Sequence, residues 1–515
     1  MFSMETLYLY LPVLILALQI LTNRILHKIQ NLPPCPFPAL PFLGHLYLLK
    51  NPFHKSLSAL SSRYGPVLSL RLGCIPVVLV SSPLAAEECL AKNDIIFANR
   101  PNFLNGKYFG YNYTSLPWSS YGEHWRNLRK ISSLEVLSSH KLQLLSDIRA
   151  DEVLSLIRKL FRVSVEDPDQ FADMRSACFD LTFNVMTRMI TGNRYYGEDI
   201  ENSEEARIFH EITSEAAKVN PKANVLDFLP FMRWFGLRDV VEKMSELQER
   251  RDKFMQNVID EHRARAGASG EKRTMIGALL DLHEKDPEYY SEETIRNLML
   301  QVLLQAGSDT TASTMEWAMA YLLDNPEVLK KAQAEIDQEV GQGRFIAECD
   351  LPQLPYLHCI INETLRLQPV TPLLMPHKAS QDCIVGGYRV PRGTVLFVNA
   401  WDIQHNSRYW DDPDKFMPQR FEALVGGKEE FKFIPFGSGR RGCPGNNLAI
   451  HVLGLALGSL LQSFNWETKD GKKMDMSEGI GVPVHRVQPL VAKCCPRPNM
   501  LKLLSQISTK SACLH

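Results

Sequence analysis

The sequence predicts a single, mainly α-helical domain with small β-sheets, which stands behind an N-terminal membrane anchor. Three observations predict this arrangement: one long apolar run at the N-terminus, a proline-rich stretch after it, and a long remainder in which helix-like apolar spacing dominates over short strand-like runs. The chain has 515 residues, of which 45% are apolar and 22% are charged. That composition is typical of a large folded protein and excludes a disordered chain, a collagen or a coiled coil.

The overall charge and the cysteine content exclude further classes of protein. The 57 lysines and arginines balance 58 aspartates and glutamates, and the formal net charge of −1 argues against a dedicated nucleic-acid binder. The 11 cysteines are irregularly spaced and form no CxxC pair. Reduced thiols in a protein that faces the cytosol fit this pattern better than a disulfide scaffold or a zinc site does.

The apolar run near the N-terminus predicts how the chain is held at a membrane. Residues 7–22, LYLYLPVLILALQILT, have no basic segment before them and no small-residue cleavage site after them, so we expect an uncleaved signal anchor over residues 1–23. Basic residues directly after the run place the following chain on the cytoplasmic side. The sequence therefore predicts a single-pass protein of the endoplasmic reticulum membrane, with a basic and proline-rich hinge over residues 24–44 and a globular domain over residues 45–515.

Within the globular part, short apolar runs predict two strands inside residues 66–82 and a β-hairpin over residues 382–398. Apolar residues spaced three and four apart predict helices, notably over residues 139–162 and 240–264. The polar, glycine-containing stretch 265–274 is expected to be an exposed loop.

A glycine-rich loop followed by an apolar helix carries the sharpest chemical signal in the chain. The loop FGSGRRGCPG runs from Phe436 to Gly445, and the helix is predicted from about Asn447 to Ser463. Cys443 thus stands close to a helix N-terminus, where the helix dipole and free amides favour a thiolate. A thiolate of this kind is a strong ligand for haem iron.

Two other interpretations of this loop exist. Gly437, Gly439 and Gly442 also spell GxGxxG, but the match lies late in the chain and opens no βαβ unit, so dinucleotide binding is poorly supported. A lone cysteine is also commonly a small buried hydrophobic residue. The loop resembles, residue for residue, the FxxGxRxCxG signature of the cytochrome P450 family. The resemblance implies the fold of that family, haem b as the cofactor, and Cys443 as the axial ligand of the haem iron.

Residues 291–324 predict one long helix that contains the sequence AGSDTT. Ser291 is placed to cap its start, and an Asn-Pro pair follows its end. Taken from its residues alone, AGSDTT predicts a close helix contact at its small residues and a satisfied polar pair. The resemblance implies instead the oxygen-activation motif of the family, in which Asp309 and Thr310 deliver protons.

Three further residues are implied to lock the core behind the haem. Glu363 and Arg366, in NETLRL, are three residues apart on a predicted helix and can pair. Spacing alone would make them an ordinary surface pair of little energetic consequence. The resemblance implies that they are buried and joined by Arg420 as a structural triad with no catalytic part.

Further candidate haem-binding residues lie at two other places in the chain and in the cysteine loop itself. Trp125 and Arg129 form a WxxxR pair, which presents an indole N–H and a guanidinium on one helix face, and both are donors suited to carboxylates. The resemblance implies that this pair and Arg441 hold a haem propionate, and it places His377 nearby.

Family placement also gives candidates for a pocket that takes a flat, lipophilic substrate, although each of them is equally consistent with ordinary core packing. These candidates are Phe103, Tyr108, Tyr111, Val302, Ala306, Val370, Leu373, Leu374, Ile480 and Val482.

The resemblance covers nearly the whole chain, and segments such as SRYGPVLSLRLG, YGEHWRNLRK and VLDFLP are similar to plant microsomal A-type members. The most similar group acts on isoflavones, lignans, other phenolics and some terpenoids. The implied activity is a monooxygenase that uses O2 and NADPH electrons, delivered by NADPH-cytochrome P450 reductase, to hydroxylate or oxidatively cyclise a lipophilic phenolic such as a flavonoid, isoflavone, lignan or xanthone precursor. A terpenoid hydroxylase is the first alternative, and a non-oxygenating haem protein on the same fold is the alternative from another class.

Overall fold

The structure is a computed structural model that describes residues 22, 25, 27–167, 169–196, 204–269, 274–422, 431–469 and 473–512. The predicted anchor over residues 1–23 lies outside these residues apart from Thr22. Among the residues that are described, none of the helices combines the length and the apolar character that a membrane crossing needs. The prediction of an anchor therefore stays a prediction.

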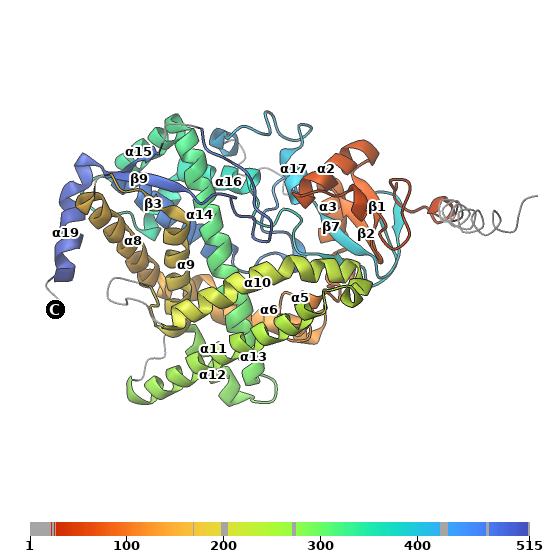
Figure 1. The fold of residues 1–515 in the computed structure, drawn as a ribbon. Helices are drawn as coiled ribbons and strands as arrows, with labels where there is room; N and C mark the ends of the chain where they lie inside the picture. The colour runs from red at the N-terminus through yellow and green to blue at the C-terminus, as the bar shows by residue number, and fades with distance from the viewer. Residues whose placement is uncertain are drawn as a thin grey trace, which may run out of the picture.

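Helices make up most of the molecule and surround α14 (Ala306–Asp324), which runs through its middle (Figure 1). The other long helices are α8 (Ser146–Glu166), α9 (Met174–Thr191), α10 (Glu204–Phe228), α11 (Asp239–Ser269), α15 (Pro326–Glu339), α16 (Pro355–Leu367) and α18 (Asn446–Ser463). The shorter ones are α2 (Phe53–Tyr64), α3 (Pro83–Glu87), α4 (Asp94–Phe97), α5 (Leu104–Lys107), α6 (Glu123–Ile131), α7 (Ser139–Leu144), α12 (Met275–Lys285), α13 (Glu292–Asn297), α17 (Ala400–His405) and α19 (Leu501–Ala512).

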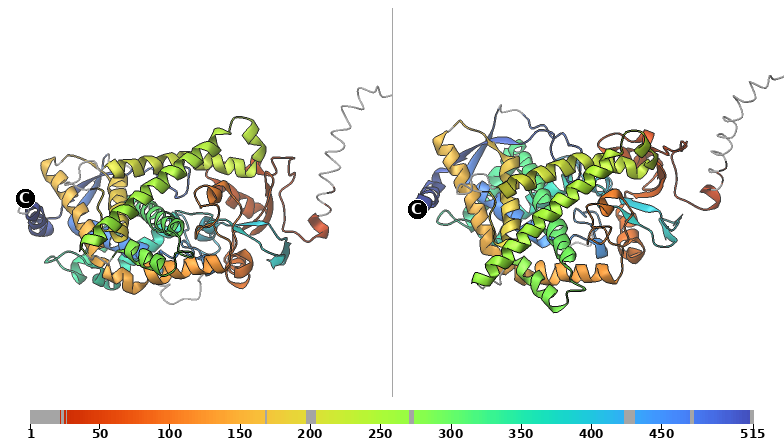
Figure 2. Two further views of the ribbon diagram at one scale, coloured as in Figure 1. Left: turned by 90° about the horizontal axis from the view of Figure 1, so that it is seen from below. Right: turned by 60° about the horizontal axis from the view of Figure 1, so that its bottom comes forward.

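The strands that the structure describes form three sheets, and their small size is what the sequence predicts. A four-stranded sheet has the order β1 (Val67–Leu72), β2 (Ile75–Val80), β7 (Val395–Val398) and β4 (His377–Lys378). A three-stranded sheet joins β3 (Ala172–Asp173), β9 (Val491–Pro496) and β8 (Phe464–Thr468), and β5 (Cys383–Val385) pairs with β6 (Tyr388–Val390). Figure 2 shows that the four-stranded sheet stands at the N-terminal side of the molecule, away from α8 and α19.

Three predicted boundaries are wrong. The helix expected over residues 139–162 is divided at Leu145 into α7 and α8. The hairpin over residues 382–398 comprises β5 and β6 only, because β7 leaves them to pair in parallel with β2. The loop expected over residues 265–274 is helical as far as Ser269, where α11 ends. Arginine and alanine alternate at the end of α11, and their high helix propensity outweighs the single glycine at position 267.

The long helix over residues 291–324 is present, and it contains a widened turn. Ser291 caps α13 by accepting a hydrogen bond from the Thr294 amide, as predicted. The π-helix η5 (Leu298–Gln305) follows and leads directly into α14 at Ala306. A π-turn re-aims the residues around it and is frequent at functional sites.

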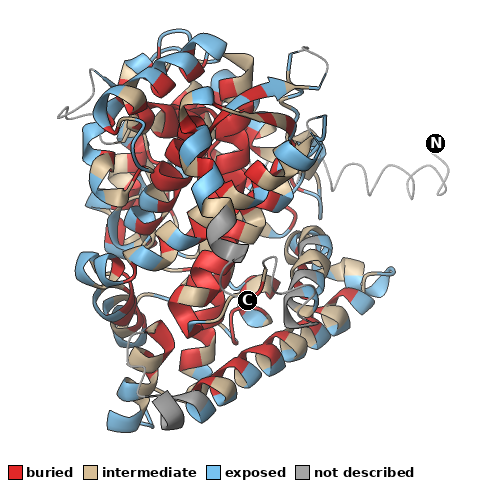
Figure 3. Ribbon diagram, turned by 90° about the vertical axis from the view of Figure 1, so that its left-hand side faces the viewer, coloured by how far each residue is buried: buried red, intermediate tan, exposed pale blue. Residues whose placement is uncertain are grey.

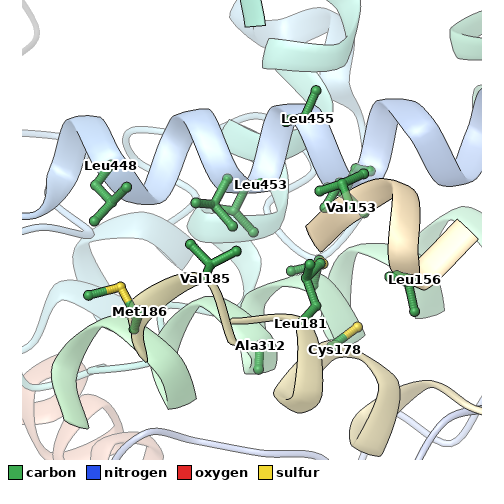
Figure 4. Close-up of a cluster of buried hydrophobic side chains, with 14 of the residues drawn as sticks. Val153, Leu156, Cys178, Leu181, Val185, Met186, Ala312, Leu448, Leu453 and Leu455 are labelled. Atoms are coloured by element: carbon green, nitrogen blue, oxygen red, sulfur yellow. The ribbon is translucent and has the colours of Figure 1, made fainter. Parts of the chain in front are cut away.

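The central core is formed where α8, α9, α14 and α18 meet (Figure 4). Figure 3 shows the buried residues gathered in the interior, while exposed residues lie on the outside. Gly307 of α14 permits the closest approach, because a Cβ there would lie 2.7 Å from the Met186 sulfur of α9. The close helix contact expected in AGSDTT is therefore real, and it fixes the helix that carries Asp309 and Thr310.

Candidate active site

The loop that carries Cys443 is shaped by its glycines. Gly437 and Gly439 both have φ of +68°, and a Cβ on Gly439 would stand 2.1 Å from the Leu90 carbonyl oxygen. The Cys443 amide donates to the Phe436 carbonyl at 2.9 Å and so closes the loop. The side chain of Cys443 is thereby held just before α18, as the sequence predicts.

Burial and the helix start act on the Cys443 thiol in opposite directions. Burial raises the pKa of this thiol, and its effect exceeds that of the Gly445 amide, the Arg129 charge and the Asn446 amide, which all lower the pKa. The amides expected from the helix start are thus in place, and both lower the pKa of the thiol. Coordination of a metal cation would lower it further, because a bound thiol is deprotonated outright.

Three arginines gather beside this loop, and the hydrogen-bond acceptors that the structure gives them are backbone carbonyls. Arg441 donates to Ala98, Leu116 and Ser119; Arg100 donates to Pro117, Met375 and Pro376; and Arg129 donates to Gly442 at 2.7 Å. Burial, together with the charges of Arg100 and Arg129, lowers the pKa of Arg441 to about 8. Burial lowers the pKa of Arg100 to about 9. Such a cluster of partly desolvated cations is built for a ligand with several negative charges.

Two neutral groups complete the cluster. The Trp125 indole Nε1 is buried and has no hydrogen-bond partner among the described residues, while the Arg441 guanidinium lies 4.5 Å from the centre of the Trp125 ring. His377 binds the Phe97 carbonyl through Nδ1, and burial with the charges of Arg100 and Arg441 lowers its pKa well below the usual range. The thiol, the cations and the free indole donor are together the set that a haem with its two propionates requires.

Arg100 was not predicted to belong to this site. It stands in FANRP, where one arginine among apolar residues and a proline gives little sequence signal. Its membership follows from the fold, because the parallel pairing of β2 with β7 and the pairing of β7 with β4 bring residues 375–377 beside the segment that follows α4.

Asp309 and Thr310 lie on α14, which packs against the cysteine-bearing α18 segment. The Thr310 hydroxyl donates to the Ala306 carbonyl at 2.5 Å, one turn back, and its oxygen lone pairs stay free to accept. Asp309 Oδ1 stands 3.3 Å from Nε2 of His485. No sequence motif indicates this histidine, since it lies far from Asp309 in the chain, near the C-terminus.

The triad of Glu363, Arg366 and Arg420 is assembled and buried. Arg366 makes a two-point contact with Glu363, at 2.7 Å and 2.9 Å, and Arg420 Nε reaches the same carboxylate at 2.9 Å. Glu363 and Arg366 are fully buried, which excludes the interpretation as an ordinary surface pair. The triad joins α16 to η7 (Pro418–Phe421).

The pocket candidates fall into separate groups. Phe103 and Leu373 pack in one cluster, and Val370 accepts the Val484 amide at 2.9 Å through its carbonyl, which brings two candidate segments together. Leu374 approaches the cysteine loop at Gly437. Ala306, Ile480 and Val482 are exposed, and the side chain of Val302 lies outside the described residues.

Two tyrosine candidates are directed toward other helices. The Tyr111 hydroxyl binds the Asp252 carboxylate of α11, and Tyr108 packs between α10 and α11. The same region holds Arg251, whose Nη2 donates to Gln305 at 2.7 Å at the end of the π-turn. This tie between α11 and η5 was not predicted, because neither residue belongs to a recognisable motif.

Asp227, at the end of α10, ties that helix to the segment with Phe103 and Tyr108 by accepting the Leu104 amide at 2.9 Å. Burial raises its pKa to about 7, although the Leu104 hydrogen bond and Arg233 oppose the rise. Because the unfolded chain releases this proton near pH 4, the folded protein loses stability as the pH rises from about 4 to about 7. Asp227→Asn should therefore stabilise the protein, relative to wild type, more at pH 8 than at pH 5. The two stabilisations should differ by on the order of 2 kcal/mol.

Thermal unfolding at the two pH values measures this difference, with the exposed Glu249→Gln as the control variant. An equal effect of Asp227→Asn at both pH values would contradict the claim that the buried Asp227 carboxyl retains its proton in the folded protein.

Comparison with known proteins agrees with this geometry. The cytochrome P450 family model matches residues 33–491. The chain is 46% identical to cytochrome P450 81Q32 of Catharanthus roseus, over 98% of this chain and 100% of that protein. It is 44% identical to the isoflavone 2'-hydroxylase of Glycyrrhiza echinata, over 95% of this chain and 97% of that protein, and 44% identical to the (+)-piperitol/(+)-sesamin synthase of Sesamum radiatum, over 93% of each.

Among solved structures, a zebra fish cytochrome P450 determined with progesterone matches with a TM-score of 0.74 and 26% identity, over 86% of this chain and 99% of that chain. The family match spans most of the sequence, the relatives match almost end to end, and the thiol and cation cluster fits the cofactor of that family. The chain therefore belongs to the cytochrome P450 family of haem-dependent monooxygenases.

Proposed function

We propose that this cytochrome P450 hydroxylates, or oxidatively cyclises, a lipophilic plant phenolic such as a flavonoid, isoflavone, lignan or xanthone precursor. The observation that carries the proposal is the combination of the Cys443 loop and its arginine cluster with an intact Asp309–Thr310 pair on the neighbouring α14. The substrate class draws on the relatives named as isoflavone hydroxylases and as a lignan-forming synthase.

Each residue of the site has a role in this proposal. Cys443 would ligate the haem iron, and Arg100, Arg129 and Arg441 would neutralise the propionates, with Trp125 as a further donor. When bound there, haem supplies the iron at which O2 is reduced with electrons from NADPH.

The protein's own chemistry on the α14 side is proton transfer. Asp309 is partly exposed and can exchange protons with water, and the Thr310 hydroxyl can both accept and donate a hydrogen bond. A non-oxygenating haem protein would have no need of this pair. The apolar candidates from the 370–374 and 480–484 segments would then orient a flat substrate.

The decisive experiment for the substrate class uses microsomes that contain this chain and a plant NADPH-cytochrome P450 reductase. They are incubated with NADPH and a panel of isoflavones, flavonoids, lignans, xanthone precursors and terpenoids, and the products are identified by mass spectrometry. Oxygenated or ring-closed phenolic products are expected. Turnover of terpenoids alone would contradict the phenolic assignment, and the absence of any NADPH-dependent product would contradict the monooxygenase.

The proposed location is the endoplasmic reticulum membrane, with the anchor over residues 1–23 and the catalytic domain on the cytoplasmic side. A surface of the described part supports membrane contact. We call it the aromatic patch, and it is formed by residues 37–47, at the end of the hinge and the start of the domain, and residues 230–235 between α10 and α11. Phe42 and Phe231 join its two halves with ring centres 6.3 Å apart. Trp234 is 84% exposed and Phe235 is 71% exposed. A large exposed patch of this kind marks a surface that contacts a membrane or a partner.

The patch predicts residual membrane binding without the anchor. A chain lacking residues 1–28 should still sediment with phospholipid vesicles, and Trp234→Ser with Phe235→Ser should weaken its partition more than about tenfold, since each buried aromatic contributes about 1.5–3 kcal/mol. Val165→Ser, an exposed apolar residue at the end of α8, is the control. Equal sedimentation of the doubly substituted and control proteins would contradict a membrane role for the patch.

The proposed electron donor is NADPH-cytochrome P450 reductase. Arg126 and Lys130 are exposed on α6, the helix whose Arg129 contacts the cysteine loop. Arg440 is exposed on the loop itself, where it also pairs with Asp94 at 2.6 Å. This basic surface lies where an acidic partner would approach Cys443, and complementary charge of this kind accelerates association.

A further inference from the structure

A hairpin near the C-terminus, residues 478–486, crosses one face of α14. Asp309, Ser313 and Trp317 are spaced four residues apart and therefore share that face. The Val484 carbonyl accepts hydrogen bonds from the Ser313 hydroxyl at 2.9 Å and from the Trp317 indole at 3.0 Å. The next residue, His485, is thereby placed with Nε2 at 3.3 Å from Asp309 Oδ1.

The hairpin is fixed at its base, so this placement is built into the fold. Glu478 pairs with Arg486 in an antiparallel bridge, and the Gly479 amide donates to the His485 carbonyl at 2.7 Å. Burial opposes ionisation of Glu478, but hydrogen bonds from His54 and Lys55 of α2 outweigh it and hold its pKa at about 2. The base of the hairpin is thus clamped to α2 by a charged carboxylate.

The other charged groups around the hairpin have partners of their own. Glu316 of α14 binds Arg175 of α9 at 3.0 Å, and Arg486 donates to the Asp475 carbonyl at 2.9 Å and lies over the Trp317 ring. Glu478 is held by α2, as described above. Within the described residues, His485 is thus the ionisable group placed against Asp309.

The exposure of the pair suits exchange with water. The side chains of His485 and Asp309 are 32% and 28% exposed, so solvent reaches both. Nδ1 of His485 is buried and has no hydrogen-bond partner among the described residues. Among the described residues, no hydrogen bond to the other nitrogen fixes the His485 ring, so its contact with Asp309 is the one that orients it.

We propose that His485 carries protons from solvent to Asp309 and so replenishes the Asp309–Thr310 pair; the inference rests on the proposed monooxygenase function. Protonated His485 donates the Nε2 proton to Asp309 Oδ1, Asp309 passes a proton toward Thr310, and neutral His485 takes a new proton from hydronium or a buffer acid. Only N–H and O–H bonds form and break, and no electrons move. His485 acts through Asp309, which is the side chain that its Nε2 faces.

Two substitutions distinguish proton transfer from anchoring. Glutamine at position 485 keeps an N–H donor for Asp309 but carries no transferable proton, whereas leucine removes both. In full-length protein with reductase, His485→Gln and His485→Leu should each lower product formed per NADPH about three- to tenfold, less than a full loss of acid catalysis because water substitutes in part. Val487→Ala, on the exposed side of the same segment, should match wild type.

Hydrogen peroxide supplied in place of NADPH and O2 provides a second readout. It brings the electrons and protons with it, so peroxide-supported product and the substrate-induced spectral shift should stay within about twofold of wild type in both variants. A wild-type yield in His485→Gln with a loss only in His485→Leu would overturn the proposal and leave His485 an anchor. Equal losses with NADPH and with peroxide would overturn it too, because they would indicate a general disturbance of the site.

A double-mutant cycle on thermal unfolding tests the pairing without any substrate. The Tm losses of Asp309→Ala and His485→Leu should not add in the double variant, because both remove the same contact. Additive losses would overturn the proposal even in an active enzyme. Wild-type protein that forms no product would contradict the proposed function, and this cycle would still decide whether Asp309 and His485 are coupled.

Discussion

Replacing Glu363 by glutamine should lower the free energy of unfolding by about 3–5 kcal/mol, because the change leaves two guanidinium groups without their anionic partner in the core. Glu363 is fully buried and accepts hydrogen bonds from Arg366, Arg420 and the Met417 amide. A loss of this size is a large part of the stability of most folded domains. We expect low yields of folded protein. Circular dichroism should show thermal unfolding at a lower temperature than in wild type.

An exposed ion pair provides the matched control. Lys331 and Glu422 stand 2.9 Å apart with about half of each side chain exposed, so Glu422→Gln should cost no more than about 1 kcal/mol. Any Glu363→Gln protein that folds should keep the wild-type ratio of product to NADPH, since the triad is structural. Similar small losses in both variants would contradict a triad that locks the core.

Replacing Thr310 by alanine should separate NADPH consumption from product formation. Haem content and substrate binding should survive, because the Thr310 hydroxyl donates only to the Ala306 carbonyl of its own helix. Without the hydroxyl, proton delivery fails and hydrogen peroxide should replace much of the product. Loss of a general acid costs on the order of 10²–10⁴ in the assisted step, and ordered water reduces the visible loss.

The control for Thr310 lies one turn further along α14. Thr314 makes the same kind of contact, from its hydroxyl to the Thr310 carbonyl at 2.9 Å, but it carries no proposed role. Thr314→Ala should keep the wild-type coupling, while Asp309→Asn should slow turnover directly. The measurement is product and peroxide formed per NADPH consumed, and unchanged coupling and rate in both Thr310→Ala and Asp309→Asn would leave AGSDTT only its packing role at Gly307.

The sequence was sufficient for those parts of the site that lie in short, contiguous motifs. The Cys443 loop requires glycines at positive φ and at a close backbone contact, so its geometry can be predicted from the residue types within the loop. The WxxxR pair and the Glu363–Arg366 pair are likewise set by helical spacing. Features that depend on residues close together in the chain can therefore be recognised in the sequence.

Residues brought together by the fold gave little or no signal. Arg100 joins the cation cluster only because β4 and β7 pair beside it, and His485 meets Asp309 only because Ser313 and Trp317 hold the hairpin. The π-turn η5 also escaped prediction, since its residues have the same apolar spacing as an ordinary helix. Long-range pairing and small changes in helical winding leave no periodicity to detect.

The reduced, CO-bound absorption spectrum of the purified full-length protein tests the central claim, that Cys443 is the thiolate ligand of a haem. The wild type should show the red-shifted Soret band of thiolate ligation, and so should the control Cys74→Ala, which removes an exposed cysteine in the turn between β1 and β2. Cys443→Ala should lose that band. A red-shifted band that persists in Cys443→Ala, or that is missing from folded, haem-loaded wild type, would contradict the account.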